Sequence, residues 1–383
     1  MNANRLLISV LFATVLCSGD GIVAQDAPDT IDPDEILATA RFLASDELAG
    51  RNFGSPEGRI AAVYIASRFE ALGLVPAGDE ESYFQSVKKG QNVIAKLPGS
   101  GDPERSGEVI VVGAHMDHLG VGENGVWNGA DDNASGVAVL IAVAEALSRG
   151  PRPARTVIFA TFDGEEKGLI GSRHYCEKPP VALEKTVLMI NLDMVGRDFM
   201  DFFPIFLFAV GSESSPAVRE VLEAKNKEGP GFRLLEFTAA LLGQFWASSD
   251  HLPFWEAKVP FLFLSTGMHK EYHKPEDDTD LLKPKKMARI AGMVTEIVRT
   301  IASAEDRPMY QELDQVITKE DRAGIEAILG PAIKLGPMMG LQPDALERLG
   351  KIESRVKDDE HEWSEAEVND LCKELRALLT RMR

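Results

Sequence analysis

The chain has 383 residues, of which 44% are hydrophobic and 26% are charged, a composition that is typical of a globular protein and argues against global disorder. It carries 41 lysines and arginines against 60 aspartates and glutamates, so its formal net charge is −19. Nucleic acids and anionic membranes attract proteins mainly through basic residues, so this charge argues against both kinds of partner. An excess of carboxylates suits metal ions or cationic ligands instead.

The N-terminus has the pattern of an export signal. Arg5 precedes an apolar run over residues 6–16, which is shorter than the ~20 residues that cross a bilayer but long enough for a signal-peptide core. We therefore predict a signal peptide over residues 1–25 and a periplasmic or secreted protein without stable membrane insertion. No small residue precedes Cys17, so a lipid anchor is not expected.

Strand-like and helical patterns alternate through the middle of the chain. Residues 34–74 have a helical pattern, and Pro56 opens a helix whose apolar residues recur at spacings of one, three and four. The later strand-like stretches are apolar on both faces, as in the middle of a covered sheet. This order predicts an α/β fold, a three-layer sandwich in which helices flank a mostly parallel central sheet. The predicted strands are 108–113, 156–162, 186–192, 205–210 and 259–264, and the helices beside them are 136–148, 216–227 and 284–301.

Residues 304–383 differ from the rest because they contain no strand-like run. Thr318 and Ser364 each precede an acidic residue by three positions, a pattern that caps helix N-termini. Gly330-Pro331 is expected to separate two helices. We predict a main domain over residues 30–303 and a helical C-terminal extension over residues 304–383.

Histidine and acidic residues follow the predicted strands, where parallel sheets place their ligand crevice. Taken singly, such residues have ordinary explanations, since an Asp pair before a helix is usually an N-cap. Taken together in one crevice, the carboxylates would repel one another, and divalent cations remove that conflict. Imidazoles combined with carboxylates favour zinc or a related first-row metal over calcium. The segments are His115 to His118, Asn128 to Gly136, Asp163 to Glu166, Asn191 to Asp193 and Tyr272 to Asp277.

The chain resembles the co-catalytic zinc peptidases of clan MH, which include bacterial leucyl aminopeptidases, glutamate carboxypeptidase II and glutaminyl cyclases. The resemblance covers about residues 34–303 and implies a zinc peptidase domain over residues 30–303. Tyr83-Phe84 is followed almost at once by the first strands, so the protease-associated domain of many relatives is not expected. The matching segments, in the family's order, are GAHMDH, NGADDNASG, FDGEEKGLIGS, NLDMVGR, SSDHLPF and YHKPEDDTD.

The resemblance also implies a set of metal ligands for two divalent cations, zinc by preference. Asp131 would bridge both cations. His115 and Asp193 would complete the first site, and Glu166 and His273 would complete the second. The family has a cis peptide bond within its Asp-Asp pair, which implies a cis bond between Asp131 and the following Asp.

Catalytic roles follow from the same resemblance. Glu165 would be the general base, Asp117 would orient His115 through the other ring nitrogen, and Tyr272 would stabilise an oxyanion. The segment with Asp250 and His251 is expected to have only a supporting role near the site.

These residues predict an exported aminopeptidase that acts on peptides with a free N-terminus. Three alternatives stay open. A carboxypeptidase would need a basic pocket, for which Arg197 is the main candidate, and a glutaminyl cyclase would bind a single zinc. A non-catalytic interaction ectodomain, as in the transferrin receptor, would lack the metal ligands. Side-chain preference, native metal and oligomeric state do not follow from the sequence.

Overall fold

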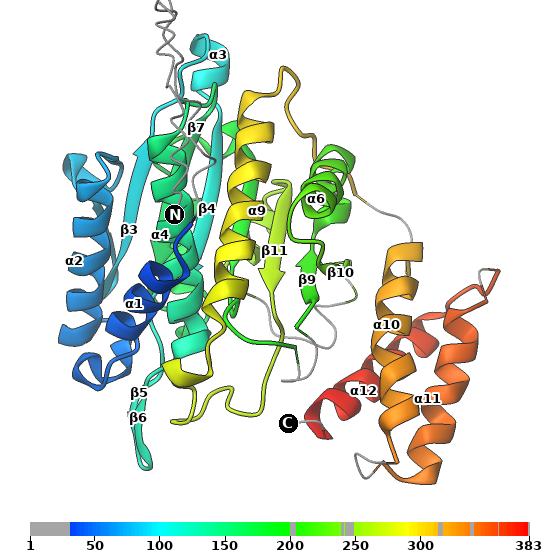
Figure 1. The fold of residues 1–383 in the computed structure, drawn as a ribbon. Coiled ribbons are helices and arrows are strands. Elements are labelled where there is room, and N and C mark those ends of the chain that lie inside the picture. Colours follow the sequence, from blue (N-terminus) through cyan, green and yellow to red (C-terminus); the bar gives the residue numbers. More distant parts are fainter. Residues whose placement is uncertain are drawn as a thin grey trace, which may run out of the picture. The chain divides into compact units, whose positions relative to one another are not determined.

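A mixed sheet forms the centre of the fold (Figure 1), and within the described residues it has nine strands. Eight of them lie in the order β1-β3-β7-β4-β8-β11-β9-β10, while β2 pairs with β3. The computed structural model describes residues 31–199, 204–238, 241, 249–312, 317–337, 341–358 and 360–381, so the predicted signal peptide, residues 1–25, lies outside it. The strands are β1 (Val75–Pro76), β2 (Phe84–Val87), β3 (Gly90–Leu97), β4 (Val109–His115), β7 (Thr156–Phe162), β8 (Thr186–Leu192), β9 (Phe206–Val210), β10 (Arg233–Leu235) and β11 (Phe261–Ser265).

The middle of the sheet is parallel, as predicted, and its flanks are largely antiparallel. Strands β7, β4, β8 and β11 run parallel to one another, whereas β3 joins β7 and β9 joins β11 in antiparallel pairs. Every residue of β4, β7, β8 and β11 is buried, which explains why these strands are apolar on both faces. β2 leads directly into β3 through a short turn, so no domain is inserted there.

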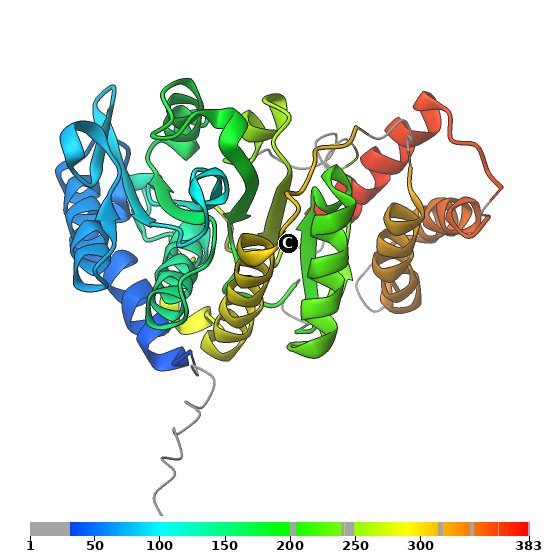
Figure 2. The ribbon, with the colours of Figure 1, turned by 90° about the horizontal axis from the view of Figure 1, so that it is seen from above.

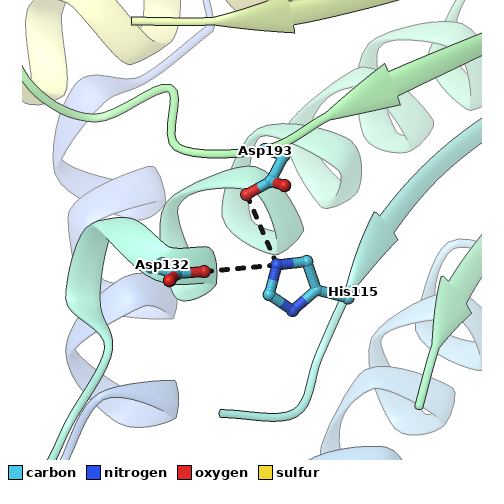
Figure 3. Close-up of side chains that lie close together, drawn as sticks. All are labelled: His115, Asp132 and Asp193. Carbon is cyan, nitrogen blue, oxygen red and sulfur yellow. Dashed lines mark hydrogen bonds and ion pairs between the residues drawn. The ribbon is translucent and has the colours of Figure 1, made fainter. Parts of the chain in front are cut away.

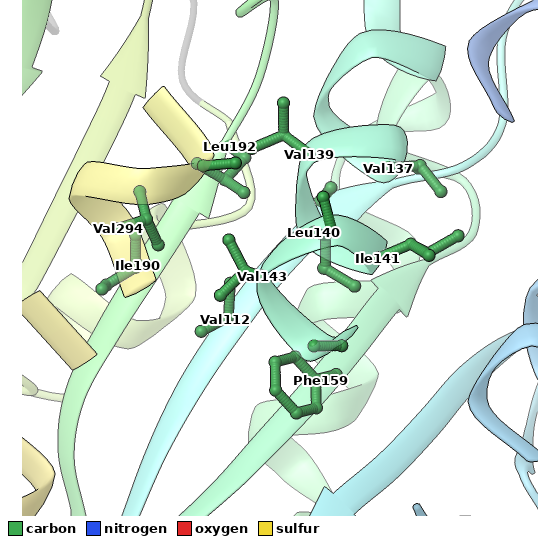
Figure 4. Close-up of a cluster of buried hydrophobic side chains, with 14 of the residues drawn as sticks. Val112, Val137, Val139, Leu140, Ile141, Val143, Phe159, Ile190, Leu192 and Val294 are labelled. Carbon is green, nitrogen blue, oxygen red and sulfur yellow. The ribbon is translucent and has the colours of Figure 1, made fainter. Parts of the chain in front are cut away.

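Helices cover both faces of the sheet. Buried side chains of α4 and α9 pack against β4, β7 and β8 on one face, as Figure 4 shows for Leu140, Val143 and Val294. Figure 2 shows α5 and α8 on the opposite face. The helices are α1 (Pro33–Leu43), α2 (Pro56–Ala71), α3 (Pro103–Ser106), α4 (Gly136–Arg149), α5 (Ile170–Glu177), α6 (Pro216–Glu228), α8 (Leu252–Glu256) and α9 (Pro284–Ser303), and β5 (Gly120–Gly122) and β6 (Gly125–Trp127) form a separate hairpin.

The described part of the C-terminal segment contains three helices, α10 (Lys319–Leu335), α11 (Pro343–Val356) and α12 (Glu365–Arg381). Both predicted capping patterns are confirmed, because Thr318 and Ser364 each exchange hydrogen bonds with the acidic residue three positions later. The predicted break at Gly330-Pro331 is wrong, since Pro331 lies inside α10. Leu329 and Ala332 on either side of it are buried, and this packing holds the helix together across the proline.

The sheet brings the predicted site residues to one edge. His115 ends β4, Glu165 and Glu166 follow β7, and Asp193 follows β8. Because these strands are parallel neighbours, their carboxyl ends open on the same side of the sheet. No helix capable of crossing a membrane is found in the part of the chain that the structure describes.

Candidate metal centre and active site

One group of possible ligands gathers around His115. Its Nε2 atom lies 3.2 Å from Oδ1 of Asp132 and 3.3 Å from Oδ1 of Asp193 (Figure 3). His115 and Asp132 are buried, and the side chain of Asp193 is 13% exposed. The nitrogen and the two oxygens lie within 4.8 Å of one another, so one cation could contact all three. This is the first cation group.

A second group lies on the other side of Asp132. Nε2 of His273 is 3.1 Å from Oδ2 of Asp132 and 3.3 Å from Oε2 of Glu166. The two carboxylate oxygens of Asp132 therefore face different groups, Oδ1 toward His115 and Oδ2 toward His273. A carboxylate in this position can bridge two cations. His273, Asp132 and Glu166 are the second cation group.

Asp131, which the sequence predicted as the bridging residue, points elsewhere. Its Oδ1 accepts a hydrogen bond from the backbone of Gly196 at 2.6 Å, and its Oδ2 lies 3.4 Å from Nε2 of His269. The backbone turns between the two aspartates, and the cis bond joins Asp132 to Asn133, not Asp131 to Asp132. The structure thus corrects both predictions by one position. Of the two aspartates, Asp132 is the one whose oxygens face both cation groups.

The loop after β11 holds this turn in place. The Asp277 carboxylate accepts hydrogen bonds from the backbone N–H groups of Asp131 and Asp132, at 3.1 Å each. Asp277 follows His273 by four residues, so one loop supplies a ligand and also fixes the backbone of the bridging residue.

Glu165 lies next to the ligand Glu166 and is held by Asp117. The backbone N–H of Glu165 donates to Oδ1 of Asp117 at 3.0 Å. Burial raises the pKa of Glu165 well above its ordinary range, and the negative charges of Asp250 and Asp193 add to this effect. A carboxylate in such a setting accepts a proton readily, as a general base must.

Asp117 contacts the ring nitrogen of His115 that faces away from Asp132 and Asp193, as the resemblance implied. The Nδ1 atom of His115 lies 3.1 Å from the main-chain oxygen of Asp117 and 3.8 Å from its carboxylate. The main chain of Asp117 therefore fixes the ring, while its carboxylate positions Glu165. One residue orients both a ligand and the candidate base.

Tyr272 packs on His273. Their ring centroids are 3.8 Å apart and the rings are inclined by 20°. Burial raises the pKa of Tyr272, with further help from the charge of Asp132, so the phenol keeps its proton. It can therefore donate a hydrogen bond at neutral pH, as stabilisation of an oxyanion requires.

Arg51 joins segments that carry the site. The side chain is 1% exposed, and burial lowers its pKa to about 10, so it stays charged at neutral pH. It comes from the segment LASDELAGR, which also resembles the N-terminal region of the family but for which no residue role was predicted. It donates hydrogen bonds to four main-chain oxygens, those of Leu43 (2.5 Å), Met116 (3.0 Å), Asn128 (2.6 Å) and Gly129 (3.0 Å).

The donor set fits divalent cations. Asp132 and Glu166 bring negative charge into a largely buried space, where like charges repel unless a cation neutralises them. Oε1 of Glu166 and both ring nitrogens of His118 make no hydrogen bond to other described residues. Imidazole nitrogens with carboxylate oxygens are ligands that zinc accepts. The resemblance implied a ligand role only for the first histidine of the HMDH segment, and His118 was not among the predicted site residues.

Asp250 and His251 occupy different surroundings. Burial raises the pKa of Asp250 to about 7. Its carboxylate also interacts electrostatically with His115 and Asp193, so Asp250 lies near the first cation group. The ring of His251 instead stacks over Phe261 and Phe263 of β11, at centroid distances of 5.1 and 4.7 Å. Its surroundings are those of a core residue.

The buried imidazole of His251 makes a pH prediction. Burial lowers its pKa from 6.5 to about 3, so between these values the unfolded chain binds a proton that the folded chain does not. The contribution of His251 to the free energy of unfolding is therefore fully present above pH ~6.5, and it falls by about 1.4 kcal/mol per pH unit between pH ~6.5 and the folded-state pKa of about 3. Between pH 8 and pH 5 the free energy of unfolding of His251→Phe should fall by about 2 kcal/mol less than that of the unsubstituted chain. Urea unfolding of both chains in chelator would measure this, and equal losses would contradict it.

Comparison with known proteins identifies a peptidase family whose model covers the residues of the site. The model of peptidase family M28 matches residues 92–298, more than half of the chain, and this segment contains both cation groups. The chain belongs to peptidase family M28. The resemblance seen in the sequence is thereby confirmed.

Relatives of this M28 chain include aminopeptidase YwaD of Bacillus subtilis (strain 168), with 27% identity over 208 residues that make up 52% of this chain and 43% of the relative. Leupeptin-inactivating enzyme 1 of Streptomyces exfoliatus is 28% identical over 234 residues, which are 60% of this chain and 48% of that enzyme. The M28 chain thus spans about half the length of these curated relatives.

Solved structures show the same fold. An aminopeptidase from Aneurinibacillus sp. strain AM-1 aligns with a TM-score of 0.58 and 18% identity, covering 75% of this M28 chain and 98% of the other. The glutaminyl cyclase of Porphyromonas gingivalis aligns with a TM-score of 0.57 and 18% identity, covering 70% and 98%. An aminopeptidase and a glutaminyl cyclase therefore share this fold, so the activity has to be argued from the site.

Proposed function

We propose that this M28 chain is an exported aminopeptidase that uses two divalent cations, zinc by preference, to release N-terminal residues from peptides. The observation that carries the proposal is the position of Asp132, whose two oxygens face two separate ligand groups at 3.2 and 3.1 Å. Glu165 lies beside Glu166 with its backbone fixed by Asp117. The named activity of relatives such as aminopeptidase YwaD supports the same reaction.

The residues divide the hydrolysis among themselves. Bound divalent cations supply Lewis acidity, which polarises a carbonyl and makes water more acidic near neutral pH. Glu165 takes a proton from the water that attacks the scissile carbonyl carbon. When the carbon–nitrogen bond breaks, Glu165 returns that proton to the leaving amine, so the base is regenerated. The phenol of Tyr272 donates a hydrogen bond to the carbonyl oxygen as it gains negative charge.

The burial and ion pair of Arg197 argue against a carboxypeptidase, which removes C-terminal residues. A carboxypeptidase needs a cation that can bind the substrate carboxylate. Arg197 is 2% exposed, and its Nη2 atom donates to Oε2 of Glu271 at 3.1 Å, so its charge is already compensated. The carboxylates around the cation groups instead suit the protonated α-amine of a peptide N-terminus.

The test is a comparison of metal-free and zinc-loaded protein on a panel of aminoacyl p-nitroanilides. We expect hydrolysis only after zinc is restored, saturation of activity at two cations per chain, and no reaction with N-acetylated substrates. An N-terminal glutaminyl peptide serves as a control for cyclisation. Saturation at one cation with cyclisation of that peptide would refute the proposal, as would cleavage from a blocked N-terminus.

Export is part of the proposal and rests on the apolar run over residues 6–16 after Arg5. Expression of the full chain with separate assays of cytoplasmic and external fractions would test it. A protein that stays in the cytoplasm with its N-terminus intact would contradict export without affecting the proposed chemistry.

A further inference from the structure

His118 lies at the second cation group. It follows β4, three residues after His115, and its side chain is completely buried. Its backbone N–H donates to the carbonyl of Arg51 at 3.3 Å, and the amide of Asn52 donates to the carbonyl of Leu119 at 2.6 Å. Hydrogen bonds on both sides thus fix the backbone that carries the ring.

The ring nitrogen closest to the group is Nδ1. It lies 2.8 Å from Oε1 of Glu166 and 3.8 Å from Oδ2 of Asp132. At 2.8 Å a hydrogen bond between His118 and Glu166 would be expected, but the directions of the two atoms do not form one. Two ligands of one cation show this arrangement, because they lie close together while both point at the cation and not at each other.

The packing around the His118 ring also supports a position beside the second cation group. A Cβ atom at Gly129 would lie 2.5 Å from Cγ and from Cδ2 of His118, so the ring packs directly on this glycine. On another side the ring of His273 stands edge to face at a centroid distance of 5.8 Å. Gly129 has a φ of +57°, a conformation that favours glycine. The chain thus keeps a place for an imidazole beside the ligand His273.

We propose that His118 is a fourth protein ligand of the second cation, which it binds through Nδ1 beside Asp132, Glu166 and His273. The inference rests on the proposed function, because it requires that the second cation group binds a metal. The first group has one imidazole and two carboxylates, so the two sites would differ in nitrogen ligands. A buried imidazole without a hydrogen bond is costly, and a cation removes that cost.

The experiment measures metal binding, not turnover. His118→Ala removes the ring, whereas His118→Asn keeps a side-chain N–H near the position of Nδ1 and removes the imidazole lone pair. If His118 is a ligand, both substitutions should weaken zinc at the second site by more than about 100-fold, beyond the ~10–100-fold typical of residues that only orient a ligand. Both should also change the visible spectrum of Co²⁺ bound there, since a nitrogen ligand is lost. Chelator competition and Co²⁺ titration give the two readouts.

A matched control is His361→Ala, because His361 lies before α12 and pairs with Glu367 at 3.3 Å. It should leave zinc affinity and the Co²⁺ spectrum unchanged. If His118→Asn binds zinc as the unsubstituted chain does, with the same spectrum, His118 is not a ligand and the inference is wrong. A loss smaller than about 100-fold in either variant would overturn it equally.

Failure of the proposed function would look different. In that case the unsubstituted chain itself would bind fewer than two cations or hydrolyse no aminoacyl anilide. An intact two-cation enzyme with unaffected His118 variants would refute only the role of His118. Circular dichroism and melting of the metal-free variants check that each one folds.

Discussion

Glu165→Gln should leave both cation sites filled and lower kcat by about 10²–10⁴-fold, the range that a general base contributes. Glutamine has the size of glutamate but cannot take the proton of the attacking water. The backbone of residue 165 should stay in place, because its N–H donates to the carboxylate of Asp117 and does not depend on the side chain. The ligand Glu166 is not altered.

The measurement combines kcat and KM on a leucyl anilide with zinc counting on the same sample. Glu177→Gln makes the same chemical change at an exposed position of α5 and should leave kcat unchanged. If Glu165→Gln retains zinc and turns over within a few-fold of the unsubstituted chain, Glu165 is not the base. If it loses zinc, the residue has a ligand role that the geometry does not indicate.

Asp132→Asn should weaken zinc binding, whereas Asp131→Asn should leave zinc binding unchanged. Asp132 presents one oxygen to His115 and the other to His273, so its loss should weaken zinc at both sites at once. The loss should lower kcat/KM by about 10³-fold or more, because the cations supply several kcal/mol of transition-state stabilisation. Asp131→Asn should retain both cations, since the side chain of Asp131 contacts Gly196 and His269.

The pair forms its own control, because the two substitutions are identical and adjacent. For Asp131→Asn we expect a loss of stability of about 1–3 kcal/mol from a weakened hydrogen bond to Gly196, seen in urea unfolding. Zinc content by atomic emission, after dialysis against a dilute chelator, reports the other effect. Loss of zinc from Asp131→Asn with retention in Asp132→Asn would reverse the assignment of the bridging residue.

The sheet could be predicted from the sequence because its central strands are buried on both faces. No charged residue interrupts β7 or β8, so the predicted ranges 156–162 and 186–192 coincide with the observed strands. The extension was less predictable. Pro331 would interrupt an isolated helix, but tertiary packing of Leu329 and Ala332 outweighs that local preference.

Which member of a pair of neighbouring residues faces the centre could not be predicted. Asp131 and Asp132 have the same side chain, and their directions depend on a turn in which Asp132 has φ −105° and ψ 91°. Asp117 was predicted to orient His115 through its other ring nitrogen, and the atom of Asp117 that contacts this nitrogen is the main-chain oxygen. Neither backbone conformation has a signature in residue type or spacing. The convergence of the five segments was predictable, because it follows from strand order alone.

Arg51 has a consequence for how small a working fragment of this protein can be. Arg51 lies upstream of residues 92–298, the segment that matches the family model. Its guanidinium nevertheless donates hydrogen bonds to the carbonyls of Met116, next to His115, and of Gly129, at the start of the turn that holds Asp132. Truncation to residues 92–298 would keep both cation groups but remove the guanidinium that holds the backbone beside them. We therefore expect that a working fragment must begin before residue 51, and that the N-terminal segment contributes to the shape of the proposed site.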